Sequence, residues 1–215
     1  MKTVITGTSR GIGCAIAKRF LEGGHSVIGL APDAAPIEHV NYTHILCDIT
    51  GELPDIDGVE ILINNAGVQT GTEKDIDVNL KGTINVTEKY AFQSRIRSVV
   101  NIASASGSTG SEFPEYAASK GGVIAYTKNV ALRLAGYGAV CNSVSPGGVL
   151  TGSNDRVLKN ERLKKAAIGE SLLGKWATEE EIAEWVYFVA VANKSMTAQD
   201  LLIDNGEAAK ANFVW

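Results

Sequence analysis

A tyrosine and a lysine stand four residues apart, at Tyr116 and Lys120. Residues at positions i and i+4 share one face of a helix, so the ammonium group of Lys120 can lie beside the phenol of Tyr116. A free phenol titrates near 10, so acid–base work at neutral pH requires roughly 4 kcal/mol of extra phenolate stabilisation. A neighbouring cation supplies part of it. In isolation the pair is a weak signal that an exposed helix surface explains more simply, so the prediction depends on the other motifs.

A glycine-rich turn, with Gly7, Gly11 and Gly13, lies between a strand pattern and a helix pattern near the N-terminus. Glycine lets the backbone bend sharply and lets bare N–H groups approach a pyrophosphate at the helix N-terminus. The structural alternative is a simple tight turn between strand and helix. A phosphoryl-transfer loop is disfavoured, because that loop needs Lys followed by Ser or Thr where this chain has Gly13 and Cys14.

These motifs must be positioned by the surrounding elements. Short apolar, β-branched segments alternate with helical stretches and predict strands at residues 2–6, 26–30, 43–47, 60–63, 98–103, 139–145 and 201–203. Strands that alternate with helices form a parallel sheet covered on both faces. The predicted fold is a single doubly wound Rossmann-type α/β domain with a seven-stranded parallel sheet.

The helices are predicted from their apolar spacing and end signals. Ile12, Ile16 and Phe20 form the buried face of the first helix, which Gly23 and Gly24 terminate. Further helices are expected near residues 72–95, 114–136 and 178–192, with Trp185 in the core, and the connection at 50–58 is expected to keep a turn or two. Polar loops at 104–112 and 149–156 follow strands and should line a ligand crevice.

The bulk composition bounds the class of protein. The chain has 215 residues, 45% hydrophobic and 20% charged, which predicts one domain over residues 1–215. A net charge of −4 leaves no basic field for nucleic acid. The cluster Lys159, Arg162, Lys164 and Lys165 is interpreted as a solvated helix face.

No apolar leader or membrane-length segment is present in the sequence, which predicts a cytoplasmic protein without membrane contact. Three cysteines without paired spacing predict reduced thiols. The histidines His25, His39 and His44 lack ligand spacing, so no metal site is expected.

Taken together, the motifs resemble the short-chain dehydrogenase/reductase family over essentially the whole chain. They are Thr6-Gly7-x-x-x-Gly11-Ile12-Gly13, Asn64-Asn65-Ala66-Gly67, Asn79, Ser104, Tyr116-x-x-x-Lys120 and Pro146-Gly147. The chain is most similar to the branch of 3-oxoacyl-carrier-protein reductases and hydroxysteroid or sugar dehydrogenases, but it is shorter between Cys47 and Asn79. The resemblance implies an NAD(P)-dependent oxidoreductase of a small secondary alcohol or ketone, with the cofactor half near 1–100 and the catalytic half near 101–215.

The resemblance also implies residue roles. Ser104 matches the serine that holds the substrate oxygen, with Ser106 as the alternative if the loop register shifts. Tyr116 would be the general acid and base, Lys120 would lower the pKa of Tyr116 and bind the nicotinamide ribose, and Asn79 would hold a water that links Lys120 to solvent.

Cofactor contacts are implied along the same edge of the sheet. They are Gly7, Ser9, Arg10, Gly11, Ile12, Gly13, Ala31, Asp48, Ile49, Asn65, Ala66, Gly67, Tyr116, Lys120, Pro146, Gly147, Val149 and Thr151. NADP(H) is favoured, because Ala31 occupies the position of the acid that selects NAD and Arg10 could pair with the 2′-phosphate. NAD(H) is the alternative, because Asp33 lies only two residues beyond Ala31.

Three further expectations complete the analysis. A nucleotide-binding redox sensor on the same fold is the alternative function, although a sensor needs no proton-transfer residues. The resemblance implies a homo-oligomer, either a dimer or a tetramer. The apolar tail Ala211–Trp215 is expected to pack across a subunit boundary.

Overall fold

The computed structural model describes residues 1–111 and 113–210 and contains one seven-stranded sheet. The strands are β1 (Lys2–Thr6), β2 (Ser26–Ala31), β3 (Tyr42–Leu46), β4 (Ile61–Asn64), β5 (Ser98–Ile102), β6 (Val140–Pro146) and β7 (Asp200–Ile203). Their order is β3-β2-β1-β4-β5-β6-β7, and each neighbouring pair is parallel. The predicted parallel sheet is therefore confirmed, with every strand end within one residue of its expected position.

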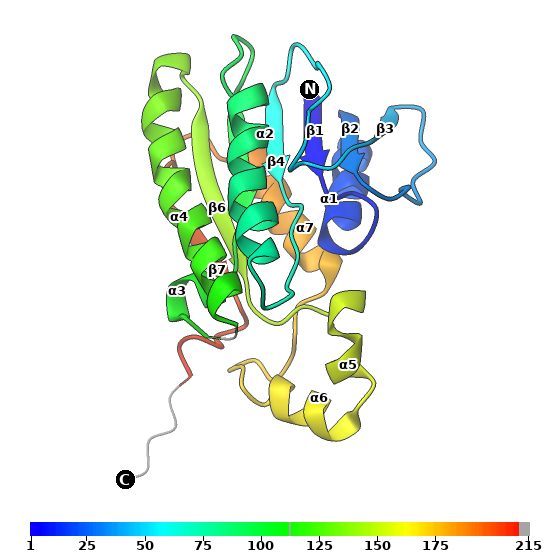
Figure 1. Ribbon diagram of the computed structural model, residues 1–215, viewed down its shortest axis with the longest axis vertical. Helices are drawn as coiled ribbons and strands as arrows, with labels where there is room; N and C mark the ends of the chain where they lie inside the picture. Colours follow the sequence, from blue (N-terminus) through cyan, green and yellow to red (C-terminus); the bar gives the residue numbers. More distant parts are fainter. Residues whose placement is uncertain (112, 211–215) are drawn as a thin grey trace.

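The chain reverses its direction of travel across the sheet between β1 and β4. It runs outward from β1 through β2 to β3 and then returns to place β4 on the other side of β1. Loops at the carboxyl ends of two such strands diverge and leave a crevice between them. Figure 1 shows these carboxyl ends pointing toward the lower part of the molecule.

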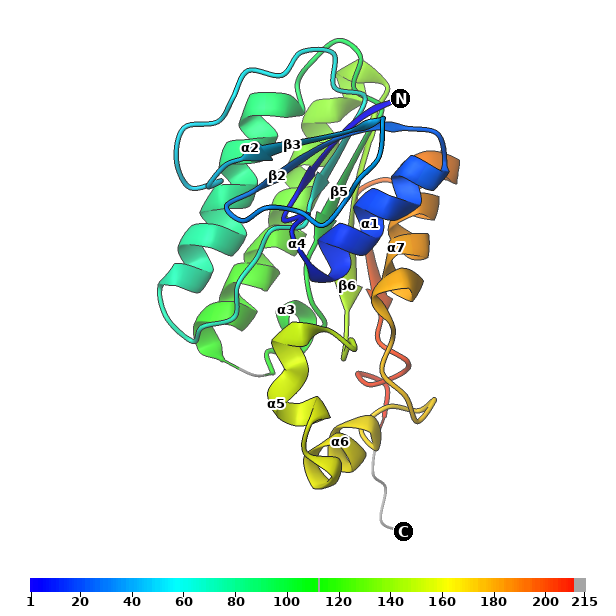
Figure 2. The same cartoon turned by 90° about the vertical axis from the view of Figure 1, so that its right-hand side faces the viewer.

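One face of the sheet is covered by α1 (Gly11–Glu22) and α7 (Glu179–Tyr187), which lie side by side in Figure 2. Ile16 and Phe20 of α1 and Ile182 and Val186 of α7 are fully buried in one cluster with the sheet. Spacing of four residues puts each pair on one helix face.

The opposite face is covered by α2 (Thr83–Tyr90) and α4 (Pro114–Leu134). Val86, Tyr90, Val130 and Leu134 are fully buried against the sheet in a second cluster. Helices therefore cover both faces, as predicted.

Local signals explain where two of these helices begin and end. The N–H of Gly23 donates to the carbonyl of Arg19, and Gly24 adopts a φ of +76°, which ends α1 at the predicted glycine pair. At α7, Thr178 and Glu181 cap each other's backbone N–H groups and form a capping box.

Two connections differ from the sequence prediction. In place of one helix near 72–95, the structure has a π-helix, η1 (Ile76–Gly82), that continues directly into α2. The α-helix α2 ends at Tyr90, five residues before the expected end. Residues 51–60 contain no helix. The Tyr90 hydroxyl donates to the carbonyl of Pro54 and the Gln93 amide donates to that of Ile56, so side chains hold this segment in place.

The prediction that Trp185 lies in the core is wrong, because the residue is 45% exposed. The buried face of α7 is set by Ile182, Ala183 and Val186, and Trp185 points away from it. The tail Ala211–Trp215 lies outside the described residues, so its expected packing stays a prediction.

Beyond the carboxyl ends of the strands, the chain forms two short helices after β6. These are α5 (Asp155–Leu158) and α6 (Glu161–Ile168), and both lie at the lower end of the molecule in Figures 1 and 2. Within residues 1–111 and 113–210, no helix combines the length and apolar character needed to cross a membrane.

Candidate active site

A cleft of about 1570 Å³ runs along the carboxyl ends of the strands and continues toward α6. Every residue predicted to contact the cofactor lines it, and so do Ser104 and Ser106. Asn79 does not line the cleft and lies behind its wall. The fold therefore brings together segments that are far apart in sequence.

The glycine turn has the shape needed for a pyrophosphate. Gly7 and Gly11 adopt φ values of +75° and +61°, which favour glycine. A Cβ on Gly13 would lie 2.1 Å from the carbonyl oxygen of Gly7, so no larger side chain fits there. The turn opens α1 at Gly11, and the helix N-terminus presents N–H groups and a partial positive charge to the cleft. These residues fit a dinucleotide.

Asn65 holds the end of β4 against this turn. Its side-chain amide donates to the carbonyls of Thr6 (3.0 Å) and Gly7 (3.3 Å), and the backbone N–H groups of Asn65 and Ala66 donate to the Thr6 hydroxyl. The side-chain amide of Asn64 instead donates to Thr87 of α2 and to Asn101 of β5.

Tyr116 and Lys120 lie on the first turns of α4 and face the cleft. The Lys120 ammonium is 5.8 Å from the centre of the Tyr116 ring and donates to the carbonyl of Ile102 at 2.9 Å. Lys120 is 4% exposed. Burial lowers the pKa of Lys120 to about 8, and the negative charge of Asp75 opposes part of that shift. The predicted pairing of the two side chains is present.

Asp75 is a fully buried acid that the sequence analysis missed. One carboxylate oxygen accepts from the N–H and the hydroxyl of Thr70, and the other accepts from the N–H of Gly71. The carboxylate thus closes the short loop that precedes η1. The shortness of the chain between Cys47 and Asn79 is the signal that could have directed attention to it.

Ser104 follows β5 and is 8% exposed beside the cleft. Its hydroxyl donates to that of Ser106 at 3.3 Å and accepts from the Ser106 N–H at 3.2 Å. The two serines are therefore neighbours at one point of the cleft wall.

Asn79 lies within the π-helix η1 and is 1% exposed. Its side-chain amide exchanges hydrogen bonds with the backbone of Val68 and donates to the Ser119 hydroxyl. A Cβ built on Gly67 would lie 3.1 Å from Asn79 Oδ1 and 3.4 Å from Lys120 Nζ, so both groups surround this glycine. π-Helical turns are frequent at functional sites.

At the far end of the cleft, the two residues that bear on cofactor choice contact each other. Arg10 Nη1 lies 3.0 Å from Asp33 Oδ2, and both side chains are mostly exposed. Ala31 at the end of β2 is buried beside them. Asp48 at the end of β3 accepts from the N–H and hydroxyl of Thr50, which lowers its pKa.

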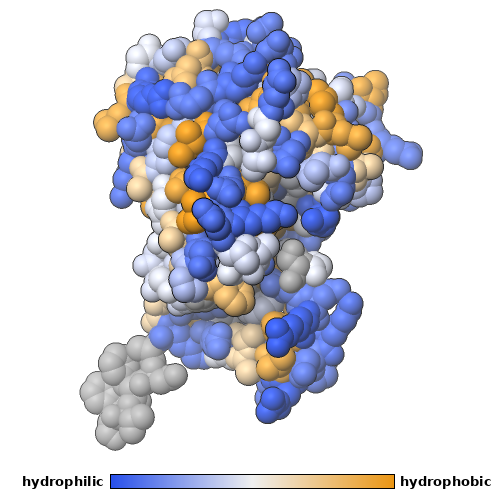
Figure 3. Space-filling model, in the orientation of Figure 1, coloured by the Kyte–Doolittle hydropathy of each residue, from blue (hydrophilic) through white to orange (hydrophobic). Residues whose placement is uncertain are grey.

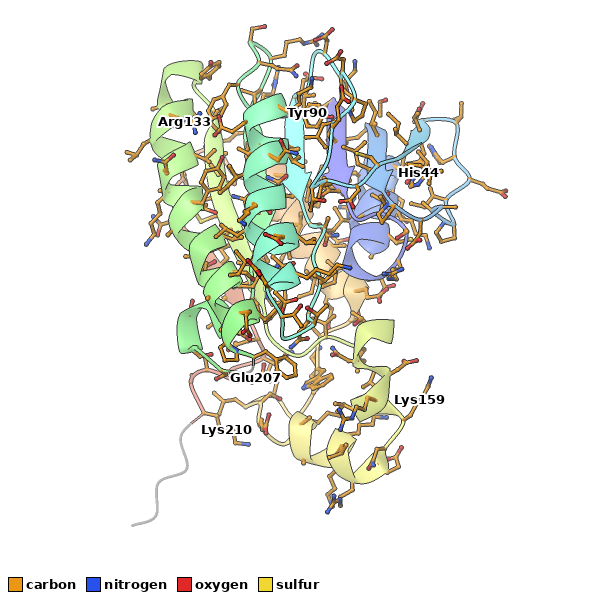
Figure 4. All side chains as sticks on the ribbon, viewed as in Figure 1. His44, Tyr90, Arg133, Lys159, Glu207 and Lys210 are labelled. Atoms are coloured by element: carbon orange, nitrogen blue, oxygen red, sulfur yellow. The ribbon has the colours of Figure 1, made fainter. Side chains whose placement is uncertain are left out.

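The loop after β6 brings backbone to the cleft at Pro146, Gly147 and Val149. The N–H of Gly147 donates to the carbonyl of Ile203, and the N–H of Gly148 donates to Glu207 Oε2 at 3.0 Å. Glu207 follows β7 and lies near the lower end of the sheet in Figure 4. Glu207 belongs to no local motif and is not among the site residues predicted from the sequence.

Lys159, Arg162 and Lys165 of the basic cluster are exposed, as expected for a solvated face, but part of the cluster also borders the cleft. Arg162 and Lys165 line the cleft, whereas Lys159 and Lys164 do not. The position of α6 beyond the carboxyl ends of the strands decides which of these cations face the cleft.

A family model for short chain dehydrogenases matches residues 2–162. The 3-oxoacyl-[acyl-carrier-protein] reductase FabG of Thermotoga maritima is 31% identical, and the alignment covers 94% of this chain and 96% of that protein.

Two solved structures have closely similar folds. A putative 2-deoxy-d-gluconate 3-dehydrogenase from Agrobacterium tumefaciens, with bound NADP, has a TM-score of 0.87 at 27% identity and covers 97% of this chain and 96% of its own. A 4-hydroxyisoleucine dehydrogenase complexed with NADH has a TM-score of 0.88 at 26% identity and covers 98% of this chain and 99% of its own.

Proposed function

Because the chain belongs to the short-chain dehydrogenase family of oxidoreductases, we propose that it transfers a hydride between nicotinamide C4 and a secondary alcohol or ketone. The observation that carries this proposal is the single cleft that joins the glycine turn to Ser104, Tyr116 and Lys120. We propose that residues 1–215 act as one domain, with the cofactor half near 1–100 and the catalytic half near 101–215.

When bound, the nicotinamide cofactor supplies or accepts the hydride. In reduction, the Tyr116 hydroxyl gives its proton to the carbonyl oxygen, and in oxidation the phenolate takes the proton from the alcohol. The buried Lys120 ammonium stabilises that phenolate. The Ser104 hydroxyl turns its hydrogen from Ser106 to the substrate oxygen, while the Ser106 N–H continues to donate to Ser104 Oγ.

Asn79 is proposed to serve proton exchange rather than to touch the substrate. Asn79 lies behind the cleft wall, and its side-chain oxygen and the Lys120 ammonium both lie next to Gly67. A water held at Asn79 would link the Lys120 ammonium to solvent, which replaces the proton that Tyr116 gives away.

NADP(H) is the proposed cofactor, with NAD(H) as the alternative. The exposed guanidinium of Arg10 at the glycine turn can pair with a 2′-phosphate, and Ala31 carries no repelling charge. Asp33 opposes this preference, because its carboxylate pairs with Arg10 at the same end of the cleft.

The test is the oxidation of NADPH and NADH, followed by absorbance, with 3-oxoacyl thioesters, diketones, oxo-steroids and ketoses as substrates. Tyr116→Phe is the control, and it should bind the cofactor normally while kcat decreases by about 10²-fold or more. An equally active Tyr116→Phe variant would refute the acid–base role. Cofactor binding without turnover of any ketone, or of any corresponding alcohol in reverse, would favour the redox sensor.

A further inference from the structure

The helix α6 turns a polar, cationic face toward the cleft. Four of its surface positions line the cleft, namely Arg162, Lys165, Ala166 and Gly169. Their spacing of i, i+3, i+4 and i+7 places them on one side of the helix. Leu163 and Ile168 are half-buried and do not line the cleft. The helix therefore directs its larger apolar side chains, Leu163 and Ile168, away from the space where a substrate would lie.

The two cations on that face have no ion-pair partner within the described part of the chain, where every ion pair involves other residues. A third cation, Lys210, donates to the carbonyl of Gly169 and ties the chain after β7 to the end of α6. Figure 4 shows Lys210 below Glu207 in this region. The charges of Arg162 and Lys165 are therefore available to bind an anionic ligand.

Acidic residues also reach this end of the cleft. Glu207 is engaged with the N–H of Gly148, and Glu170 lies past the end of α6. The cations Arg162, Lys165 and Lys210 outnumber these two acids at this end. The Arg162–Lys165 face is positive along the helix itself.

The other lining residues near α6 and Ser104 are mainly polar or small, including Thr109, Ser111 and Asn154. Among the described residues, the large exposed apolar side chains Leu150, Leu172 and Leu173 do not line the cleft. Figure 3 shows mostly hydrophilic side chains over α5 and α6. Sites for long acyl chains or steroids are lined mainly by apolar and aromatic groups. Near α6, the larger apolar side chains that line the cleft are Val149 and Trp176.

We propose that the substrate is a small, polar carbonyl or alcohol compound that carries a carboxylate or a phosphate, and that Arg162 and Lys165 bind this anionic group. The inference rests on the proposed hydride transfer and specifies its substrate class. It also gives a role to the two exposed cations that α6 presents to the cleft. Arg pairs well with both anions, so the two are distinguished by experiment.

The experiment compares each anionic compound with a neutral counterpart of similar shape. One arm pairs oxo acids with their methyl esters, and the other pairs ketose phosphates with free ketoses. The variant Arg162→Gln/Lys165→Gln should raise KM for the preferred anion about tenfold or more, with little change in kcat, in cofactor affinity or in turnover of the neutral compound. Lys164→Gln is the matched control, because Lys164 is on α6 but does not line the cleft.

Salt gives a second signature. The KM of the anionic substrate should rise with ionic strength in the wild type and less so in the double variant, because exposed charges are screened. Neutral esters or free ketoses turned over as well as the anions would overturn the proposal. So would turnover confined to acyl chains on an acidic carrier protein.

A separate binding measurement keeps this proposal distinguishable from the proposed function. Calorimetric titration of each acid or phosphate into the protein saturated with NADP⁺ requires no turnover. Binding that weakens in the double variant supports the anion site even if no compound is reduced. If none of these compounds binds while other ketones are turned over, the anion site is wrong and the hydride-transfer function stands.

Discussion

At the residue scale, the charge on Lys120 is set by two opposing influences. Burial disfavours the ammonium and lowers the pKa of Lys120 to about 8, while the buried Asp75 carboxylate favours the ammonium. The ammonium is therefore retained at neutral pH and lost as pH rises through about 8. Asp75 does not line the cleft and is assigned as a positioning residue that acts through Lys120.

Replacing Asp75 by Asn should lower the pKa of Lys120 below about 8, because a favourable charge is removed while Lys120 stays buried. An NMR titration of the Lys120 side chain measures this directly. Asp77→Asn is the matched control, because Asp77 pairs with Lys81 on the surface of the same helix. Identical titration midpoints in Asp75→Asn and wild type, in a variant with unchanged thermal unfolding, would contradict the assigned interaction.

Replacing Asp33 by Asn should increase the preference for NADPH over NADH about tenfold, a change of about 1.4 kcal/mol. The substitution removes a charge that repels the 2′-phosphate and releases Arg10 from its ion pair. Values of kcat/KM for the two cofactors measure the effect, and Arg10→Gln should change the ratio in the opposite direction. A wild-type enzyme that prefers NADH would refute the NADP assignment.

At the element scale, the glycine turn and α1 form one unit whose shape depends on the absence of side chains. The turn packs against Asn65 at the end of β4, and Gly13 lies in contact with the Gly7 carbonyl. The position of α1 therefore depends on β4, through Asn65, as well as on the sequence of α1 itself. Close packing of this kind leaves no space for one methyl group.

Gly13→Ala should destabilise the fold by about 1–3 kcal/mol and weaken cofactor binding, because the new Cβ would collide with the Gly7 backbone. Urea unfolding and a cofactor fluorescence titration measure the two effects. Gly136→Ala is the control, since nothing lies within 4 Å of a Cβ there and its φ is not in the left-handed region. Equal stability of the two variants would show that the turn is less tightly packed than described.

At the scale of the whole molecule, two aromatic side chains are left on the surface. Trp185 and Phe188, at the junction of α7 and η4 (Phe188–Ala192), are 45% and 49% exposed, with ring centroids 6.3 Å apart. An exposed aromatic pair is more typical of an interface than of a solvated helix. We propose that it belongs to the contact between copies of this chain.

The variant Trp185→Lys/Phe188→Lys should shift the protein toward a smaller species in size-exclusion chromatography with light scattering, because buried lysines would oppose association. Val40→Lys is the control, as Val40 is 94% exposed and lies away from both aromatic residues in sequence. A wild-type monomer, or an assembly unaffected by the double substitution, would contradict the proposed interface.

The strands, the ends of α1, the start of α4 and the two local motifs of the site could be predicted from the sequence. Strand and helix periods are read over a few residues, and the glycine turn and the Tyr116–Lys120 spacing are equally local. The parallel sheet then follows, because helices alternate with its strands.

The contacts between side chains that are far apart in sequence could not be predicted, because they depend on how the elements pack. Asn79 bonds to Ser119, 40 residues away, Asp75 acts on Lys120, and Glu207 holds Gly148. The same applies to the exposure of Trp185 and to the cations of α6 that face the cleft. These features depend on how helices, strands and loops pack against one another. The local pattern of a segment does not specify which other segment it will contact.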